Sequence, residues 1–332
     1  MDLKTVISDS SRTSKIPTVI TDEVFTVKFY NDVAKKLIPG LSVGHGFDEY
    51  VTIYDKSELK RSKYPCSMLI GCGEMKYPGV FCPVTAGFAK ECVFSIAVGT
   101  EGDDCEQYLT MKLAVISKCL TGKGSGAPAG KERAYGRMYS SYEANARMLA
   151  AMSEEEAFSA INIKQLLSEV FDYYAAIKYG AESTKRFDIQ TDEDYVKIKN
   201  ALCIVLVFLY DLCQTISRNS FCNISVKSGK DGTTFLFTVR PKHKLASLVK
   251  ECGETEEAVY TLLGRGAENI LLIKTLARRM RGQADMEYDT DSDELRFCVA
   301  APFDNKDVVK AGGGQLAETA RIAADVCLSG VT

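Results

Sequence analysis

The stretch from residue 264 to residue 302, GRGAENILLIKTLARRMRGQADMEYDTDSDELRFCVAAP, is the most informative part of this 332-residue chain. Its segment ILLIKTLARRM predicts a helix that stops at Gly282. The segment ADMEYDTDSDELRFCVAAP predicts an antiparallel hairpin that ends in proline. Gly264 and Gly266 precede the helix, where glycines let an anion approach the backbone N–H groups of the first turn. A plain helix start after a glycine turn explains the same residues, so the phosphate site stays open.

The residues before this stretch continue the mixture of helices and strands. NIKQLLSEVFDYYAAI predicts a helix, KRFDI a strand, and TDEDYVKIKNALCIVLVFLYDLCQTIS a long, mostly buried helix with an acidic first turn. CNISVKSGKDGTTFLFTVR predicts a hairpin around Asp231-Gly232. We therefore expect a two-layer α/β sandwich over residues 161–303. A tail, residues 304–332, should follow as a small helix on a glycine-rich tether.

Residues 101–160 read as a helical hairpin. DDCEQYLTMKLAVISKCL and a second amphipathic segment from Arg133 to Ala160 each carry one apolar stripe, and TGKGSGAPAGKE separates them. Two helices joined by a short glycine-rich loop commonly dimerise into a four-helix bundle. The hairpin therefore predicts a homodimer.

Residues 13–100 predict a mixed sheet. PTVITD and EVFTVKFY read as strands, and NDVAKKL reads as a short helix with Asn31 at its N-cap and Pro39-Gly40 at its end. CSMLIGCGEM, GVFCPVTAGF and ECVFSIAVG, separated by glycine and proline, predict successive antiparallel strands. The fold class is thus α+β or α/β, with several domains.

Composition excludes some classes of function. A net charge of −3 gives no bulk attraction to nucleic acid or to an anionic membrane. The longest apolar run, Ala201–Tyr210, is well short of the roughly 18 residues that a spanning helix needs. The 12 cysteines include no CxxC pair, which favours buried reduced thiols over a disulfide framework or a zinc site. We therefore expect a cytoplasmic protein without nucleic-acid or membrane partners.

The order of these blocks resembles a sensor histidine kinase. That family implies a PAS sensor, a dimerisation hairpin and an ATP-binding domain of the gyrase, heat-shock-protein and kinase type, here covering Ile16 to Pro302. The family's glycine box, GxGxGL, is matched by Gly264 and Gly266. Ala267-Glu268-Asn269 replaces its second half, and the glutamate would repel a triphosphate. Asn269 is therefore an altered box position.

The other ATP boxes are also altered. Asp211 stands where the family has the asparagine that holds magnesium; it could bind Mg²⁺, or it could be an acidic residue facing solvent. After FLFTV the family has a DxGxG box whose aspartate accepts from the adenine amino group. Here Arg240 and Lys242 occupy the aspartate and first glycine positions, and arginine is donor-only. The resemblance thus implies ATP and magnesium as cofactors, but the residues oppose nucleotide binding.

The phosphoacceptor is missing at its usual place. The family's HExxxPL pattern puts a histidine on the first hairpin helix, where QYLTMKLAVI offers Gln107. A different register offers Tyr142, in SYEANARML. Only His45 and His243 occur in the chain, and neither falls in the predicted hairpin. We therefore expect no phosphorylated histidine there.

The sensor block offers two candidate ligand contacts. Asn31 follows FTVKFY as a residue common in PAS domains, and His45 lies between glycines in VGHGFDEYV. The N-cap role explains Asn31 equally, and a surface-loop role explains His45.

These observations favour a signalling protein that has lost kinase activity, with no assigned cofactor. It would act through ligand sensing, a homodimer, and a response regulator or partner kinase. One alternative is a divergent but active histidine kinase or ATPase, in which Asp211, Gly264 and Gly266 still hold Mg-ATP. The other is a partner-binding adaptor that senses no ligand.

Overall fold

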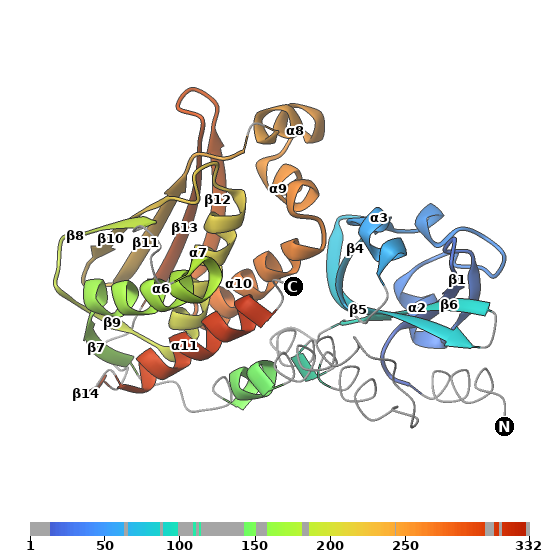
Figure 1. The fold of residues 1–332 in the computed structure, drawn as a ribbon, viewed down its shortest axis with the longest axis horizontal. Helices are drawn as coiled ribbons and strands as arrows, with labels where there is room; N and C mark the ends of the chain where they lie inside the picture. Colours follow the sequence, from blue (N-terminus) through green and yellow to red (C-terminus); the bar gives the residue numbers. More distant parts are fainter. Residues whose placement is uncertain are drawn as a thin grey trace. The chain divides into compact units, whose positions relative to one another are not determined.

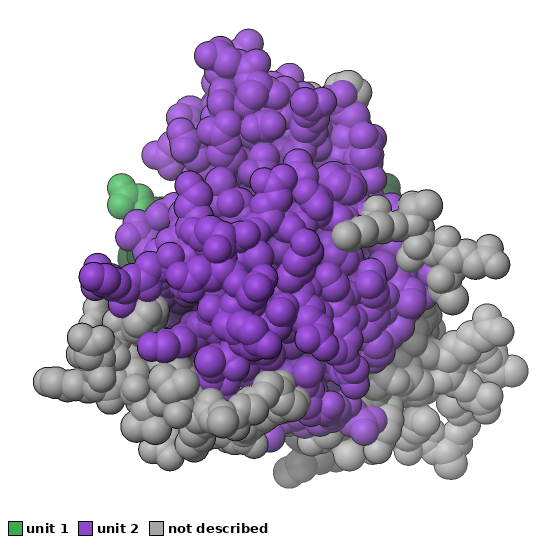
Figure 2. Space-filling view, turned by 90° about the vertical axis from the view of Figure 1, so that its left-hand side faces the viewer, with its two compact units in different colours: residues 1–128, 263–268 green, residues 129–262, 269–332 purple. Residues whose placement is uncertain are grey.

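The structure is a computed structural model that describes residues 14–62, 66–86, 89–98, 109–110, 113, 143–150, 158–180, 186–242, 244–302, 309–311 and 314–329. The chain forms two compact units, residues 1–128 with 263–268 and residues 129–262 with 269–332 (Figures 1 and 2). No helix formed by the described residues combines the length and the apolar character that crossing a bilayer requires.

The first unit is built on a six-stranded sheet in the order β2-β1-β6-β5-β4-β3, and every pair is antiparallel, so the prediction of a mixed sheet here is wrong. Its elements are β1 (Thr18–Asp22), β2 (Val27–Tyr30), α2 (Asp32–Leu37), η1 (Phe47–Glu49), β3 (Thr52–Ile53), α3 (Lys56–Arg61), β4 (Cys66–Cys72), β5 (Met75–Ala86) and β6 (Ala89–Ile96). The short helix predicted after Asn31 and the three successive antiparallel strands β4, β5 and β6 are confirmed. The predicted strand EVFTVKFY is shorter than expected, because regular pairing begins only at Val27.

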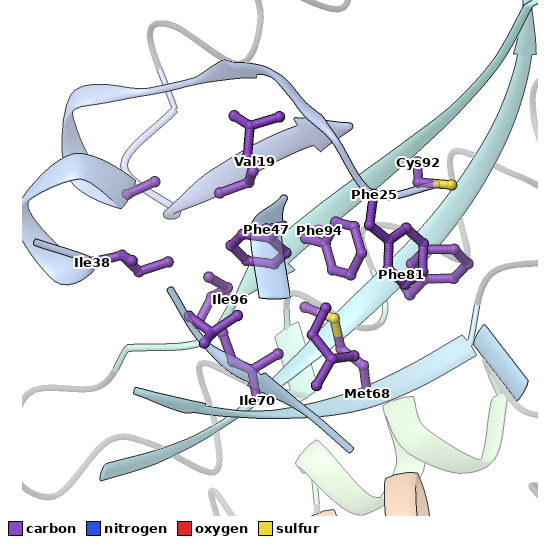
Figure 3. Packing of buried hydrophobic residues seen from close by; sticks show 14 of the residues in the cluster. Val19, Phe25, Ile38, Phe47, Met68, Ile70, Phe81, Cys92, Phe94 and Ile96 are labelled. Atoms are coloured by element: carbon purple, nitrogen blue, oxygen red, sulfur yellow. The ribbon is translucent and has the colours of Figure 1, made fainter. Parts of the chain in front are cut away.

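Four phenylalanine rings fill the centre of the first unit. Phe25 and Phe94 meet edge to face with ring centroids 5.1 Å apart, and Phe47 and Phe94 are 4.9 Å apart. Phe81 lies 5.1 Å from Phe94, and Figure 3 shows the four rings side by side. Edge-to-face contacts of this kind are among the preferred geometries of aromatic pairs. The described interior is therefore packed with aromatic side chains.

The second unit is an α/β sandwich. Its main sheet has the order β12-β13-β11-β10-β8, in which β8 and β10 are parallel and the other pairs antiparallel, and a smaller sheet has the order β14-β7-β9. Helix α7 contacts β10 and β11, and α11 contacts both α6 and α7. The elements are β7 (Phe158–Asn162), α6 (Ile163–Tyr179), β8 (Phe187–Thr191), β9 (Tyr195–Ile198), α7 (Asn200–Ile216), β10 (Cys222–Ser228), β11 (Gly232–Val239), α8 (Leu245–Cys252), α9 (Thr255–Leu263), η2 (Gly264–Ala267), α10 (Glu268–Arg279), β12 (Gln283–Asp289), β13 (Glu294–Pro302), β14 (Val309–Ala311) and α11 (Gly314–Ser329). The two predicted hairpins are confirmed as β10–β11 and β12–β13.

One predicted helix begins too early. Tyr195–Ile198 is strand β9, which alternates exposed and buried residues and pairs with β7. Lys199 has an extended backbone and caps α7, whose first turn holds no acidic residue. The acidic start predicted for this helix is therefore wrong, because these residues pair with β7, a strand that is distant in the sequence.

The chain beyond Pro302 is part of the second unit. Strand β14 pairs in parallel with β7. Helix α11 spans 16 residues and buries Leu316, Ala320, Ala323 and Ala324. The helix expected in this tail exists, and its apolar side belongs to the core.

The predicted helical hairpin falls mostly outside the described residues. Within it, residues 109–110, 113 and 143–150 are helical. Gln107 and Tyr142, the two alternative phosphoacceptor positions, both lie outside the described residues, as does His243. The dimerisation hairpin therefore stays a prediction.

Gly282 is required where α10 turns into β12. A Cβ atom there would lie 2.1 Å from the carbonyl oxygen of Ala300 on the neighbouring strand. Because backbone must then move, we expect Gly282→Ala to lower the free energy of unfolding by about 1–3 kcal/mol. Gly229→Ala is the control, since its Cβ would meet only an ordinary contact at 3.8 Å. Thermal melting compares the two variants, and equal melting would contradict the steric account.

Candidate functional site

Helices α6 and α7 share a charged cluster that is largely shielded from solvent. Lys178 Nζ on α6 lies 3.3 Å from Asp211 Oδ1 on α7, and their side chains are 14% and 13% exposed. The Tyr174 hydroxyl donates to the same carboxylate oxygen and accepts from Lys178. Tyr174 and Lys178 are four residues apart, so they project from one face of α6. The sequence thus brings an ammonium, a phenol and a carboxylate together inside the helical layer.

This environment holds Tyr174 in its protonated form. Burial is the largest cause that raises the pKa of Tyr174 well above its ordinary value, and the negative charge and hydrogen bond of Asp211 act in the same direction. The ammonium of Lys178 also lies 5.0 Å from the centroid of the Tyr174 ring, a cation–π distance. Tyr174 therefore acts as a donor to Asp211 and not as an acid or base at neutral pH.

Three buried hydrogen-bond donors lie near this cluster, toward the C-terminal ends of α6 and α7. Arg186 stacks on Tyr179 with 3.9 Å between its guanidinium carbon and the ring centroid, and the Tyr179 hydroxyl lies 3.4 Å from Gln214 Oε1. Within the described residues, no hydrogen-bond partner reaches Arg186 Nε, Gln214 Nε2 or the Tyr210 hydroxyl. Buried donors are costly unless they are paired. This end of α6 and α7 is therefore a candidate site for a polar, acceptor-bearing group.

Asp211 is the residue that the resemblance places at the magnesium position. It does not face solvent, which removes that alternative, because its carboxylate is engaged by Tyr174 and Lys178. Across the described part of the chain, no group of three or more His, Cys, Asp or Glu side chains could hold a metal ion. A magnesium ion at Asp211 would have to compete with the ammonium of Lys178. Magnesium binding there stays a prediction.

Arg240 and Lys242 form part of an exposed basic strip at the end of β11. The amide of Arg218 donates to the carbonyl of Arg240 at 2.9 Å, and the amide of Lys242 donates to Ile216 at 3.0 Å. The strip is defined as Arg218, Arg240, Lys242 and Lys244, which are all exposed. Arg218 also contacts Asp293 at 3.3 Å. The position expected to present an acceptor to adenine therefore presents donor-only side chains.

The two glycines that the resemblance assigns to a glycine box precede α10. Gly264 and Gly266 lie in η2, and Gly264 has φ +58°, in the left-handed region that favours glycine. Gly264 is buried and Gly266 is exposed, while Asn269 is half-buried in the first turn of α10. Both glycines group with the first unit, whereas Asn269, Asp211 and Arg240 group with the second. Their joint role as an ATP site stays a prediction.

Asn31 has a structural role in the first unit. Its Oδ1 accepts from the amides of Thr18, at 3.1 Å, and Ala34, at 2.9 Å. Its Nδ2 donates to the carbonyls of Ser14, at 3.2 Å, and Ile16, at 2.8 Å. The expected N-cap is therefore confirmed, and the same side chain also ties the start of β1 to α2. A ligand role for Asn31 stays a prediction.

His45 lies in a loop of the first unit. Its side chain is 58% exposed, and Nδ1 lies 3.5 Å from a carboxylate oxygen of Glu49. The backbone carbonyl of His45 accepts from the amide of Val27 at 2.8 Å. This position fits the surface-loop alternative, and a ligand contact stays a prediction.

The partners of Asp211 were not predicted from the sequence. Tyr174 belongs to the segment NIKQLLSEVFDYYAAI that was predicted as a helix, whereas Lys178 lies just beyond it, because α6 continues to Tyr179. Their four-residue spacing on one helix face was a usable signal. That spacing does not identify α7 as the opposing element, so only the packing reveals the cluster.

Comparisons with known proteins give structural matches alone. No family model matches the chain, and no curated protein matches it. Among solved structures the chain is similar to the Acinetobacter baumannii histidine kinase AdeS, at 12% identity and a TM-score of 0.42 over 59% of this chain and 98% of that one. It is also similar to the histidine kinase ThkA in complex with response regulator protein TrrA, at 13% identity and a TM-score of 0.34 over 87% of this chain and 96% of that one. We therefore assign residue roles from the geometry of this chain.

Breaking the Lys178–Asp211 pair should destabilise the second unit. We expect Asp211→Asn and Lys178→Met each to lower the free energy of unfolding by about 2–4 kcal/mol, because each leaves a shielded charged group without its counter-charge. The double variant should lose less than the sum of the two. Urea denaturation measures all four proteins, and strictly additive losses would show that the pair is not coupled.

Alkaline pH provides a second test of the cluster. Because the pKa of Tyr174 is higher in the folded than in the unfolded chain, its contribution to stability is complete well below about pH 10 and falls progressively as the pH rises above that value. Tyr174→Phe should therefore lose less unfolding free energy than the natural chain between about pH 9 and about pH 11. Tyr195→Phe, at a side chain 65% exposed, is the control and should follow the natural chain. An unchanged slope in Tyr174→Phe would refute the assignment.

Proposed function

We propose that the chain is a signal-transduction protein built like a PAS-containing sensor histidine kinase, and that it does not phosphorylate itself on histidine. The observation that carries the proposal is the strip after β11. Arg240 and Lys242 are exposed donors there, and a donor cannot accept a hydrogen bond from the adenine amino group. The shape of an ATP-binding domain is kept, but the chemistry of base recognition is lost.

The topology of each unit supports this proposal. The first unit has an antiparallel sheet with two short helices, α2 and α3, between β2 and β4, an arrangement compatible with a compact sensor. In the second unit, a buried helix, a hairpin, a connecting helical segment, another helix and a final hairpin follow one another from α7 to β13. The resemblance to the histidine kinase family implies the same order of elements for the ATP-binding domain.

The charge environment of Asp211 also supports a loss of activity. The family's asparagine is neutral and holds magnesium, whereas Asp211 is committed to an ammonium and a phenol. Removing it from these partners would leave Lys178 as a shielded cation without its counter-charge. Metal binding at Asp211 would therefore be opposed by the cost of breaking the cluster.

The proposed input is a small ligand or a partner protein received by the first unit. The four packed phenylalanine rings occupy the described centre of that unit, so a ligand would bind beside this cluster, with Asn31 and His45 as candidate contacts. The proposed output passes through a homodimer, with a response regulator or a partner kinase as the target. Such signalling requires a structural element that can pack in two alternative ways, and binding of the ligand or partner must shift the equilibrium between them.

Calorimetric titration with Mg-ATP tests the central claim. We expect no binding heat at millimolar nucleotide, and no label on the protein after incubation with labelled ATP. A histidine kinase with an intact DxGxG box serves as the positive control in both assays. Micromolar affinity would refute the loss of nucleotide binding, and acid-labile phosphate on the protein would establish the divergent active kinase.

Light scattering of the full chain at micromolar concentration tests the proposed dimer. We expect twice the mass of the 36.5 kDa chain. A monomer would favour the adaptor alternative, in which the second unit binds a partner without a dimeric hairpin.

A further inference from the structure

Helix α11 carries a row of charged side chains along one side. Glu318, Arg321 and Asp325 are spaced three and four residues apart, which places them on neighbouring turns of the same face. Ala320, Ala323 and Ala324 are buried. The helix therefore packs with its apolar residues, while a charged edge contacts other helices.

The charged edge is joined to α6. The Tyr173 hydroxyl donates to Asp325 Oδ1 at 2.7 Å, and Arg321 pairs with Glu169. Burial, followed by the hydrogen bond with Asp325, raises the pKa of Tyr173 to about 12, which keeps this phenol a donor at neutral pH. Two side-chain contacts on successive turns thus fix the orientation of α11 against α6.

The same edge reaches the helical residues 143–150. Arg147 Nη2 donates to Glu318 Oε1 at 2.7 Å, and Arg147 Nη1 lies 3.5 Å from Asp325 Oδ2. Asp325 is therefore shared, with one oxygen on Tyr173 of α6 and the other on Arg147. Ala144 and Met148, one turn apart on the helix of Arg147, are buried.

We propose that α11 is a latch that holds the 143–150 helix to α6, so that these three helical segments behave as one body. The latch is electrostatic, because one guanidinium bridges two carboxylates of α11. Arg147, Glu318 and Asp325 are 44%, 56% and 29% exposed, so each contact is weak and is screened by salt. A role of the latch in signalling rests on the proposed function, in which residues 143–150 belong to the hairpin that connects the sensor and the ATPase-like domain.

Amide hydrogen exchange of the full-length protein tests the latch. We expect Arg147→Glu, which places a third carboxylate beside two others, to speed exchange of residues 143–150 on the order of tenfold. Lys164→Glu is the matched control, since it makes the same charge reversal at an exposed position of α6. The natural chain in about 1 M salt, where the screening length is about 3 Å, should shift in the same direction as Arg147→Glu.

A charge swap separates the latch from simple damage to the fold. Arg147→Glu combined with Glu318→Arg should return the exchange of residues 143–150 most of the way to that of the natural chain. If Arg147→Glu behaves like Lys164→Glu, or if the swap rescues nothing, the latch is wrong. The experiment contains no nucleotide, so its failure leaves the proposed loss of ATP binding untouched, and the reverse also holds.

Discussion

Helix α7 is apolar around its whole circumference, and this constrains the rest of the second unit. Every residue from Ala201 to Tyr210 is buried. A helix of this kind must be covered on all sides, because each apolar side chain left in water forgoes about 25 cal/mol per Å². Strands β10 and β11 cover one side, while α6 and α11 contact it from others. Burial of α7 therefore requires both the sheet and the other helices of the second unit.

This requirement explains why the polar residues of α7 are tied so closely. Asp211 and Gln214 enter a layer that offers little water, so each must find its partner among protein groups. Asp211 is paired with Lys178 and Tyr174. Gln214 is paired with the Tyr179 hydroxyl through Oε1 only, because its Nε2 has no partner among the described residues. It also explains why α11 belongs to the core: without it, one side of α7 would face solvent.

Local patterns predicted the elements well where neighbours in sequence are neighbours in space. The β10–β11 and β12–β13 hairpins and helix α6 follow from turn residues, alternation and helical periodicity. Prediction failed at Tyr195–Ile198, whose strand character depends on pairing with β7. The candidate site divides in the same way. Asp211 was found by position in a family pattern, but its partners are set by how α6 lies on α7, which no spacing in the sequence encodes.

The proposed loss of nucleotide chemistry is compatible with an intact fold because the residues concerned do not support the core. From Val239 to Lys242 the side chains alternate between buried and exposed, with Val239 and Pro241 buried and Arg240 and Lys242 exposed. The backbone of the same segment makes the structural contacts, through the carbonyl of Arg240 and the amide of Lys242. Any residue other than proline supplies those backbone groups equally well. An exposed side chain that accepts a hydrogen bond from the adenine amino group can therefore be replaced by a basic one without destabilising the sheet. For this reason the fold alone does not reveal the activity.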